Sequence, residues 1–242
     1  MVGKSQIKFI RSLQLKKYRK LNGLFVAEGV KLVNELLQAE LTSEGVFTTH
    51  PELLPPRFSS FEVIGEADLK RMSGLKTPNK VLAVFRIPET TEPVLEEWTL
   101  ALDGVKDPGN LGTIIRLCDW FGIPQIVCSE DTVDCFNPKV LQATMGSIAR
   151  VKIAYTALEP LLTDSEHSTF GADMHGENIY ELEFPSKGIL VMGNEAHGIS
   201  DEVGVLLDKK VSIPQFGQSS VESLNVATAT AILLNELRRE GR

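Results

Sequence analysis

The chain has 242 residues, of which 43% are hydrophobic and 24% are charged, so it can bury a sizeable core and is not a disordered polypeptide. Its formal net charge of −7, taken alone, argues against a nucleic-acid partner. No apolar run approaches the roughly 18 residues of a membrane span, and the N-terminus lacks the apolar stretch of a signal peptide, so we expect a soluble cytoplasmic protein without a membrane partner.

Basic residues are concentrated at the start of the chain. Residues 1–31 hold eight basic side chains against one acidic side chain, whereas the remainder holds 17 basic and 31 acidic residues. Because phosphate binding depends on local potential, this arm could bind RNA on an otherwise acidic protein; a solvated amphipathic helix is the plainer alternative. The eight basic residues are Lys4, Lys8, Arg11, Lys16, Lys17, Arg19, Lys20 and Lys31.

The first part of the chain alternates between helical and extended patterns. This alternation predicts a small α/β domain over residues 1–90. The segment 87–98, which is rich in Pro and Glu and has no apolar periodicity, is interpreted as a linker. The predicted elements are, in order, a basic helix at 5–21, a strand at 25–29, a helix at 30–38, strands at 45–49 and 61–65, a helix at 66–74 and a strand at 81–87.

A second domain is predicted over residues 96–242, where the alternation is more regular. Short apolar strands that alternate with helices predict an α/β fold with a parallel sheet covered on both faces. The strands are expected at 99–105, 125–130, 151–155, 169–174, 188–192 and 209–214, and the helices at 111–122, 137–150, 199–208 and 223–240.

Three junctions between a strand and a helix in this domain are rich in glycine and polar residues. They are Lys106–Gly112, Gly193–Gly198 and Pro214–Asn225. In a parallel sheet, ligands bind beyond the carboxyl ends of the strands. Three such loops at one edge therefore predict a single composite site.

The first loop leads into Asn110, Gly112 and Arg116. Residues four apart share a helix face, and long side chains lean toward the helix N-terminus, so Arg116 is expected to lie over Gly112 toward Asn110. A guanidinium beside free amides at a helix start would hold a phosphate oxygen. The alternative, with Asn110 as the N-cap and Arg116 as a solvated charge, is equally compatible with this motif alone.

The other two loops each have a functional and a structural interpretation. Glu195 could bind a cation or anchor Arg116, and Gly193 allows close approach of the backbone to a ligand, but both also suit a glycine-bounded turn. Ser223 is a natural helix N-cap. Asn225 lies in the first turn of a very apolar helix, which has no evident structural need of an amide side chain. Its presence therefore favours the functional interpretation.

Motifs of several other chemistries are absent from the sequence. Three cysteines without a CxxC pair and four histidines without HxxxH spacing predict neither disulfides nor a metal site. GxGxxG, the Walker GxxxxGK motif and GxSxG are also missing. A doubly wound sheet for another nucleotide cofactor is therefore a weak alternative.

Taken together, NLGTIIR, GNEAHG and IP…SLNVA resemble the three signature motifs of the SpoU (TrmH) family of RNA 2′-O-ribose methyltransferases. The motifs occur in order, at the predicted strand ends, across the second domain. In the first domain, GLFVAEGVKLVNELL is similar to the family's L30e-like substrate-binding domain. The segment between Gly217 and Ser223 is longer than the family's usual spacing, which affects the match at Gly217 but not that of SLN.

The resemblance implies a SPOUT-type domain with a C-terminal trefoil knot, S-adenosylmethionine as cofactor and a homodimer. It implies methylation of a ribose 2′-hydroxyl in structured RNA, and the extra N-terminal domain favours ribosomal over transfer RNA by analogy. A non-catalytic RNA-binding or ribosome-assembly factor is the alternative function. The matching catalytic positions are Arg116, Asn110, Glu195, Ser223 and Asn225, and the matching cofactor contacts are Gly193, Ile213 and Leu224.

Overall fold

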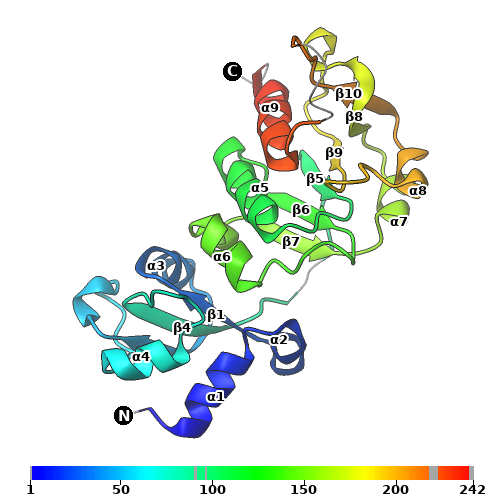
Figure 1. The fold of residues 1–242 in the computed structure, drawn as a ribbon. Helices are drawn as coiled ribbons and strands as arrows, with labels where there is room; N and C mark the ends of the chain where they lie inside the picture. The colour runs from blue at the N-terminus through cyan, green and yellow to red at the C-terminus, as the bar shows by residue number, and fades with distance from the viewer. Residues whose placement is uncertain (1, 90–91, 96, 218–222, 240–242) are drawn as a thin grey trace. The chain divides into compact units, whose positions relative to one another are not determined.

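The computed structural model describes residues 2–89, 92–95, 97–217 and 223–239. The chain forms two compact units (Figure 1). Unit 1 holds Met1–Glu89 and Asp134–Ala149, and unit 2 holds Thr90–Val133 and Arg150–Arg242. Each helix in the described part of the chain is too short or too polar to cross a bilayer.

Unit 1 is a three-layer α/β unit built on a sheet of order β1-β4-β2-β3. Strands β1, β4 and β2 pair antiparallel, and β3 pairs parallel to β2. Successive residues of a strand face opposite sides, so Val26 packs with α1 and α4 whereas Phe25 packs with α3 and α6. The elements are α1 (Lys4–Ser12), α2 (Lys16–Asn22), β1 (Leu24–Glu28), α3 (Val30–Gln38), β2 (Ser43–Thr48), η1 (Pro51–Leu53), β3 (Glu62–Val63), α4 (Glu66–Met72), β4 (Val81–Arg86), α6 (Pro138–Thr144) and η2 (Ser147–Ala149).

The single basic helix predicted over 5–21 is two helices, α1 and α2. The break frees the carbonyl oxygens of Leu13 and Gln14, which accept hydrogen bonds from Arg19 Nη1 at 2.9 and 2.8 Å. Arg19 Nε and Nη2 donate to Asp134 Oδ2 at 3.0 and 2.5 Å, and the side chain is only 2% exposed. Arg19 is therefore a buried structural residue and not part of an exposed basic surface.

Unit 2 contains a six-stranded sheet of order β10-β8-β9-β5-β6-β7. Every neighbouring pair is parallel, which confirms the predicted parallel α/β sheet. The elements are β5 (Thr99–Leu102), α5 (Pro108–Phe121), β6 (Gln125–Cys128), β7 (Lys152–Tyr155), α7 (Leu158–Thr163), β8 (Thr169–Asn178), η3 (Ile179–Glu181), β9 (Ile189–Met192), α8 (Asp201–Gly204), β10 (Lys209–Ser212) and α9 (Val226–Arg239).

Helices cover both faces of this sheet, as expected. Ala101, Val127 and Val191 pack with α7 and α8 on one face. Helices α5 and α9 contact each other and lie on the opposite side in Figure 1. The apolar side of α5, which includes Leu111 and Ile115, is fully buried, so its other side remains available for function.

Some helix boundaries differ from the predicted ones for local reasons. The helix predicted over 137–150 stops at Thr144, because Met145 and Gly146 adopt positive φ angles of 53° and 101°, a conformation that ends a right-handed helix. Helix α9 begins at Val226 rather than at 223. The long segment between Gly217 and Ser223 lies outside the described residues.

Candidate functional site

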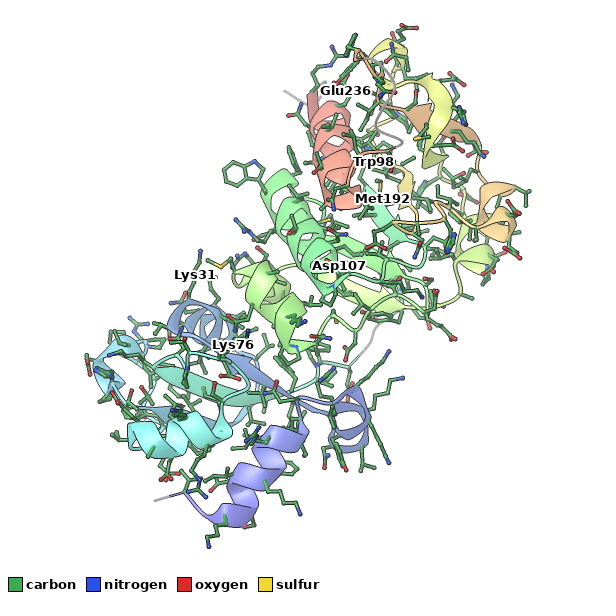
Figure 2. The ribbon with its side chains drawn as sticks, viewed as in Figure 1. Lys31, Lys76, Trp98, Asp107, Met192 and Glu236 are labelled. Carbon is green, nitrogen blue, oxygen red and sulfur yellow. The ribbon has the colours of Figure 1, made fainter. Side chains whose placement is uncertain are left out.

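The glycine-rich loops after β5 and β9 and the loop before α9 meet around the start of α5. Because β5, β9 and β10 are parallel members of one sheet, their carboxyl ends share one edge. Figure 2 labels Asp107, at the start of α5, and Met192, the last residue of β9. The composite site inferred from the sequence therefore has a physical counterpart in unit 2.

Asp107 is the N-cap of α5. Its Oδ1 accepts a hydrogen bond from the Asn110 backbone N at 2.8 Å, and Pro108 occupies the first helical position, a common helix start. The interpretation of Asn110 as the cap is thus wrong. Its side chain is left to make contacts with other loops.

A chain of hydrogen bonds joins three of the five expected catalytic residues. Asn110 Nδ2 donates to Glu195 Oε1 at 3.0 Å, and Asn225 Nδ2 donates to Asn110 Oδ1 at 2.9 Å. These residues come from three separate segments of the chain, since Glu195 and Asn225 follow Asn110 by 85 and 115 positions. The contacts fix the amide of Asn110 between a carboxylate and a second amide.

Glu195 organises the loop before α5 and does not pair with Arg116. Its carboxylate also accepts from the backbone N of Lys106 and of Asp107, at 3.2 and 3.1 Å. Partial burial opposes ionisation, but the donors from Asn110, Lys106 and Asp107 outweigh it and hold the pKa of Glu195 below its usual range. The expected Glu195–Arg116 pair is therefore wrong: the carboxylate binds these three donors, and Arg116 forms no ion pair within the described part of the chain.

Arg116 lies on the solvent side of α5. Among the described residues it has no hydrogen-bond or ion-pair partner. Thr113 and Trp120 are exposed on the same helix, at spacings of three and four residues that put them on one face with Arg116. This leaves the guanidinium available to a ligand.

Asn225 has a structural role that the sequence reasoning missed. Its Oδ1 accepts from the backbone N of Ala227 and Thr228, at 3.0 and 3.3 Å, and so caps α9. Ser223 is exposed and is not the cap. Asn225 therefore uses its oxygen for the helix and its Nδ2 for Asn110.

The three expected cofactor contacts differ in their surroundings. A Cβ at Gly193 would collide with the backbone of Gly198 and Ile199, so this glycine is required for closure of the loop itself. Ile213 is half-buried just after β10, and Leu224 is 48% exposed beside Asn225. Apolar surface is thus present next to the polar network.

A second polar cluster, which the sequence analysis did not identify, holds the loop before α5. Lys106 Nζ donates to the Asp131 carboxylate, and Ser129 Oγ donates to Asp131 Oδ1 at 2.6 Å while it accepts from Gly104 N at 2.8 Å. The hydrogen bond from Lys106 contributes most to lowering the pKa of Asp131. The signal was available: Ser129 directly follows β6, so its loop shares the same sheet edge.

Comparison with known families assigns both parts of the chain. Residues 97–235 match the SpoU rRNA Methylase family, and residues 4–83 match the MRM3-like substrate binding domain. The first range contains all the site residues described above, and it covers more than half of the chain.

Relatives of similar length support this match. A Bacillus subtilis (strain 168) 23S rRNA (guanosine(2553)-2′-O)-methyltransferase is 28% identical over 96% of both chains. A TrmH-family protein from Porphyromonas gingivalis is 40% identical, with a TM-score of 0.90 over 99% of both chains. An AdoMet-bound rRNA methyltransferase from Sinorhizobium meliloti is 30% identical, with a TM-score of 0.86 over 99% of this chain and 97% of that chain.

Proposed function

This chain belongs to the SpoU rRNA methylase family, and on that basis we propose that it methylates a ribose 2′-hydroxyl of ribosomal RNA with S-adenosylmethionine as methyl donor. The observation that carries the proposal is the hydrogen-bonded chain from Glu195 through Asn110 to Asn225, which joins the three family motifs at one sheet edge. The Bacillus relative is named for this chemistry on 23S rRNA, and the Sinorhizobium neighbour binds AdoMet.

The residues beside this network suit an adenosine-bearing methyl donor. We propose that main-chain groups at Gly193, Ile213 and Leu224 hold it, because the exposed Leu224 and half-buried Ile213 offer apolar surface next to polar backbone. When bound, S-adenosylmethionine supplies an electrophilic methyl group. The protein's task is then to orient a hydroxyl oxygen toward it, about 3 Å away and in line.

Arg116 is the residue that we assign to the RNA. A guanidinium, with a pKa above ~12, is a poor base, so we propose that it grips the phosphate beside the target ribose and stabilises the oxygen as negative charge develops. That phosphate, or a water molecule, accepts the proton. The exposed position of Arg116, without a partner in the described part of the chain, supports this role.

The other expected catalytic residues act by positioning. We propose that Asn110, Ser223 and Asn225 orient the nucleotide. Glu195 keeps Asn110 and the start of α5 in place, since its carboxylate binds their donors. Glu195 thus positions Asn110 and the loop before α5 instead of Arg116.

Two experiments test the proposed activity. Titration of the protein with S-adenosylmethionine in a calorimeter should give heat of binding, and mass-spectrometric mapping of ribosomal RNA should show one 2′-O-methyl nucleotide that is lost when the gene is deleted. Arg116→Ala should abolish turnover and preserve cofactor binding. Absence of binding heat in the unmodified protein would favour the alternative, a non-catalytic RNA-binding or ribosome-assembly factor, and a mark lost from transfer RNA would identify the other substrate.

The domain types, the oligomeric state and the location of the protein are proposals as well. We propose an L30e-like substrate-binding domain over 1–90 and a SPOUT domain with a trefoil knot over 96–242, in a cytoplasmic homodimer. The exposed lysines of α1 and α2, with Leu21 at 73% exposure beside them, favour RNA docking on unit 1. The 84% exposure of Trp120 on α5 favours burial of that helix end by a second subunit.

A further inference from the structure

Unit 1 contains a cavity of about 730 Å³, whereas the residues proposed for methyl transfer belong to unit 2. It opens between the carboxyl end of β1, the loop after α4 and the first turns of α6. Its volume is in the range of small-molecule sites. The residues that line it are Gln14, Val26, Glu28, Gly74, Leu75, Lys76, Asn137, Pro138, Lys139, Leu141, Gln142 and Ala143.

Glu28, which is 5% exposed, connects the walls of the cavity through hydrogen bonds. Its carboxylate accepts from Gly74 N at 2.8 Å and from Ser73 Oγ at 2.5 Å on one wall, and from Gln14 Nε2 at 3.5 Å on another. Its backbone oxygen accepts from Gln142 Nε2 of α6 at 2.6 Å. All three walls are thus tied to the end of β1, so the cavity is a built feature of the unit.

The lining of the cavity combines apolar side chains with a few polar atoms. Val26, Leu75 and Pro138 supply apolar surface. Gln142 Oε1 and Asn137 Nδ2 have no hydrogen-bond partner among the described residues, since the bonds of these side chains use Gln142 Nε2 and Asn137 Oδ1. One free acceptor and one free donor beside apolar walls match the edge and faces of a nucleobase.

Two exposed lysines line the cavity. Lys76, labelled in Figure 2, and Lys139 both line the cavity and are exposed, and neither forms an ion pair with any residue that the structure describes. Gln14 lies in the short link between α1 and α2, so the cavity adjoins the basic N-terminal segment. Two uncompensated lysines at the opening fit the phosphates on either side of a bound nucleotide.

We propose that this cavity binds one unstacked nucleobase of the RNA substrate, and that Lys76 and Lys139 contact the flanking phosphates. The inference rests on the proposed function for the identity of the ligand as RNA. It adds a second RNA-binding point, distinct from the methylated nucleotide, that selects substrates with an unpaired base in the corresponding place.

The test is a binding experiment on the full-length chain with an unmodified 23S rRNA transcript, made without S-adenosylmethionine. Ala143→Phe fills the cavity and should weaken binding about tenfold without changing its salt dependence. Removing both lysines (Lys76→Ala with Lys139→Ala) should lower the slope of log K against log salt by about 1.4, at roughly 0.7 per phosphate contact. Ala67→Phe and Lys70→Ala, exposed on α4 outside the cavity, are the matched controls and should bind like the unmodified chain.

Ultraviolet cross-linking of the same transcript, followed by mass spectrometry, locates the base directly. Nucleotide adducts are expected on peptides containing residues 74–76 or 137–143, and they should disappear in Ala143→Phe. Unchanged affinity of Ala143→Phe, or adducts only elsewhere, would overturn the proposal. Urea unfolding of each variant followed by circular dichroism checks that unit 1 remains folded, and because RNA binding is measured without the methyl donor, a failure of methyl transfer does not affect this result.

Discussion

Replacing Glu195 with Gln tests whether the carboxylate organises the site. The substitution keeps the shape but puts an NH2 group where an oxygen now accepts. Three donors converge on this carboxylate: the backbone N of Lys106 and of Asp107, and Asn110 Nδ2. With Gln, at least one of them faces another donor, so we expect the loop before α5 to shift and Asn110 to lose its orientation.

The size of the effect follows from the number and exposure of these bonds. A hydrogen bond to a charged group contributes about 1.5–3 kcal/mol when buried, but Glu195 is exposed enough for water to compete. We therefore expect a loss of about 1–2 kcal/mol in the free energy of unfolding of unit 2. A comparable loss in the transition state lowers kcat about 5- to 30-fold.

Tryptophan fluorescence during urea unfolding measures this stability, because both tryptophans, Trp98 and Trp120, lie in unit 2. The folded-state pKa of Glu195 is lowered, so its stabilisation is complete above the unfolded pKa of about 4.3 and is lost as the pH falls through the folded value. The difference between the unmodified protein and Glu195→Gln should therefore be constant near neutrality and shrink in acid.

The control is Glu202→Gln, which removes the same charge from an exposed position on α8. It should leave the unfolding midpoint and kcat unchanged. If Glu195→Gln is as stable and active as the unmodified protein, or if its stability deficit is independent of pH down to pH 3, the carboxylate does not organise the loop and the positioning role is wrong.

Three further substitutions test other contacts. Arg19→Ala leaves a carboxylate and two carbonyl groups without their donor, and should cost unit 1 about 3–5 kcal/mol in urea unfolding followed by circular dichroism; equal stability of Arg19→Ala and the exposed control Lys20→Ala would contradict this. Asn225→Asp keeps the oxygen that caps α9 but loses the donor to Asn110, so methyl incorporation should fall at least tenfold. Its free energy of unfolding should change by less than the roughly 1 kcal/mol of a lost cap; full activity would remove Asn225 from the site. Trp120→Glu should convert a dimer into a monomer in analytical ultracentrifugation, and an unmodified chain that sediments as a monomer would refute the dimer.

Local sequence patterns were sufficient for most elements of the fold. The apolar periodicity of Val30–Gln38 predicts α3 over the observed residues, and the apolar runs at 99–105 and 125–130 predict β5 and β6 as buried parallel strands. These signals are local, because each depends only on side chains a few positions apart. The apolar pattern predicts the helix only from residue 111, whereas α5 begins at Pro108 with Asp107 as its N-cap, and the Asp-Pro pair is a local signal for that start.

Helix ends and breaks depended on distant partners. The break between α1 and α2 is stabilised by Arg19 together with Asp134, which lies 115 residues later in the chain. No local sequence pattern predicts this ion pair. Arg19 was therefore counted with the exposed basic residues. A buried ion pair of this kind depends on which surfaces the tertiary fold brings together.

The sequence by itself determined which loops form the candidate site. The carboxyl ends of parallel strands share one edge of the sheet, so the polar loops that follow these strands could be placed at that edge. It did not determine the pairing inside the site. Glu195 faces Asn110 and two amides instead of Arg116, and Asn225 caps a helix while it binds Asn110. Such contacts are decided by angles and distances of a few tenths of an ångström between separate loops, which only the packed tertiary structure sets.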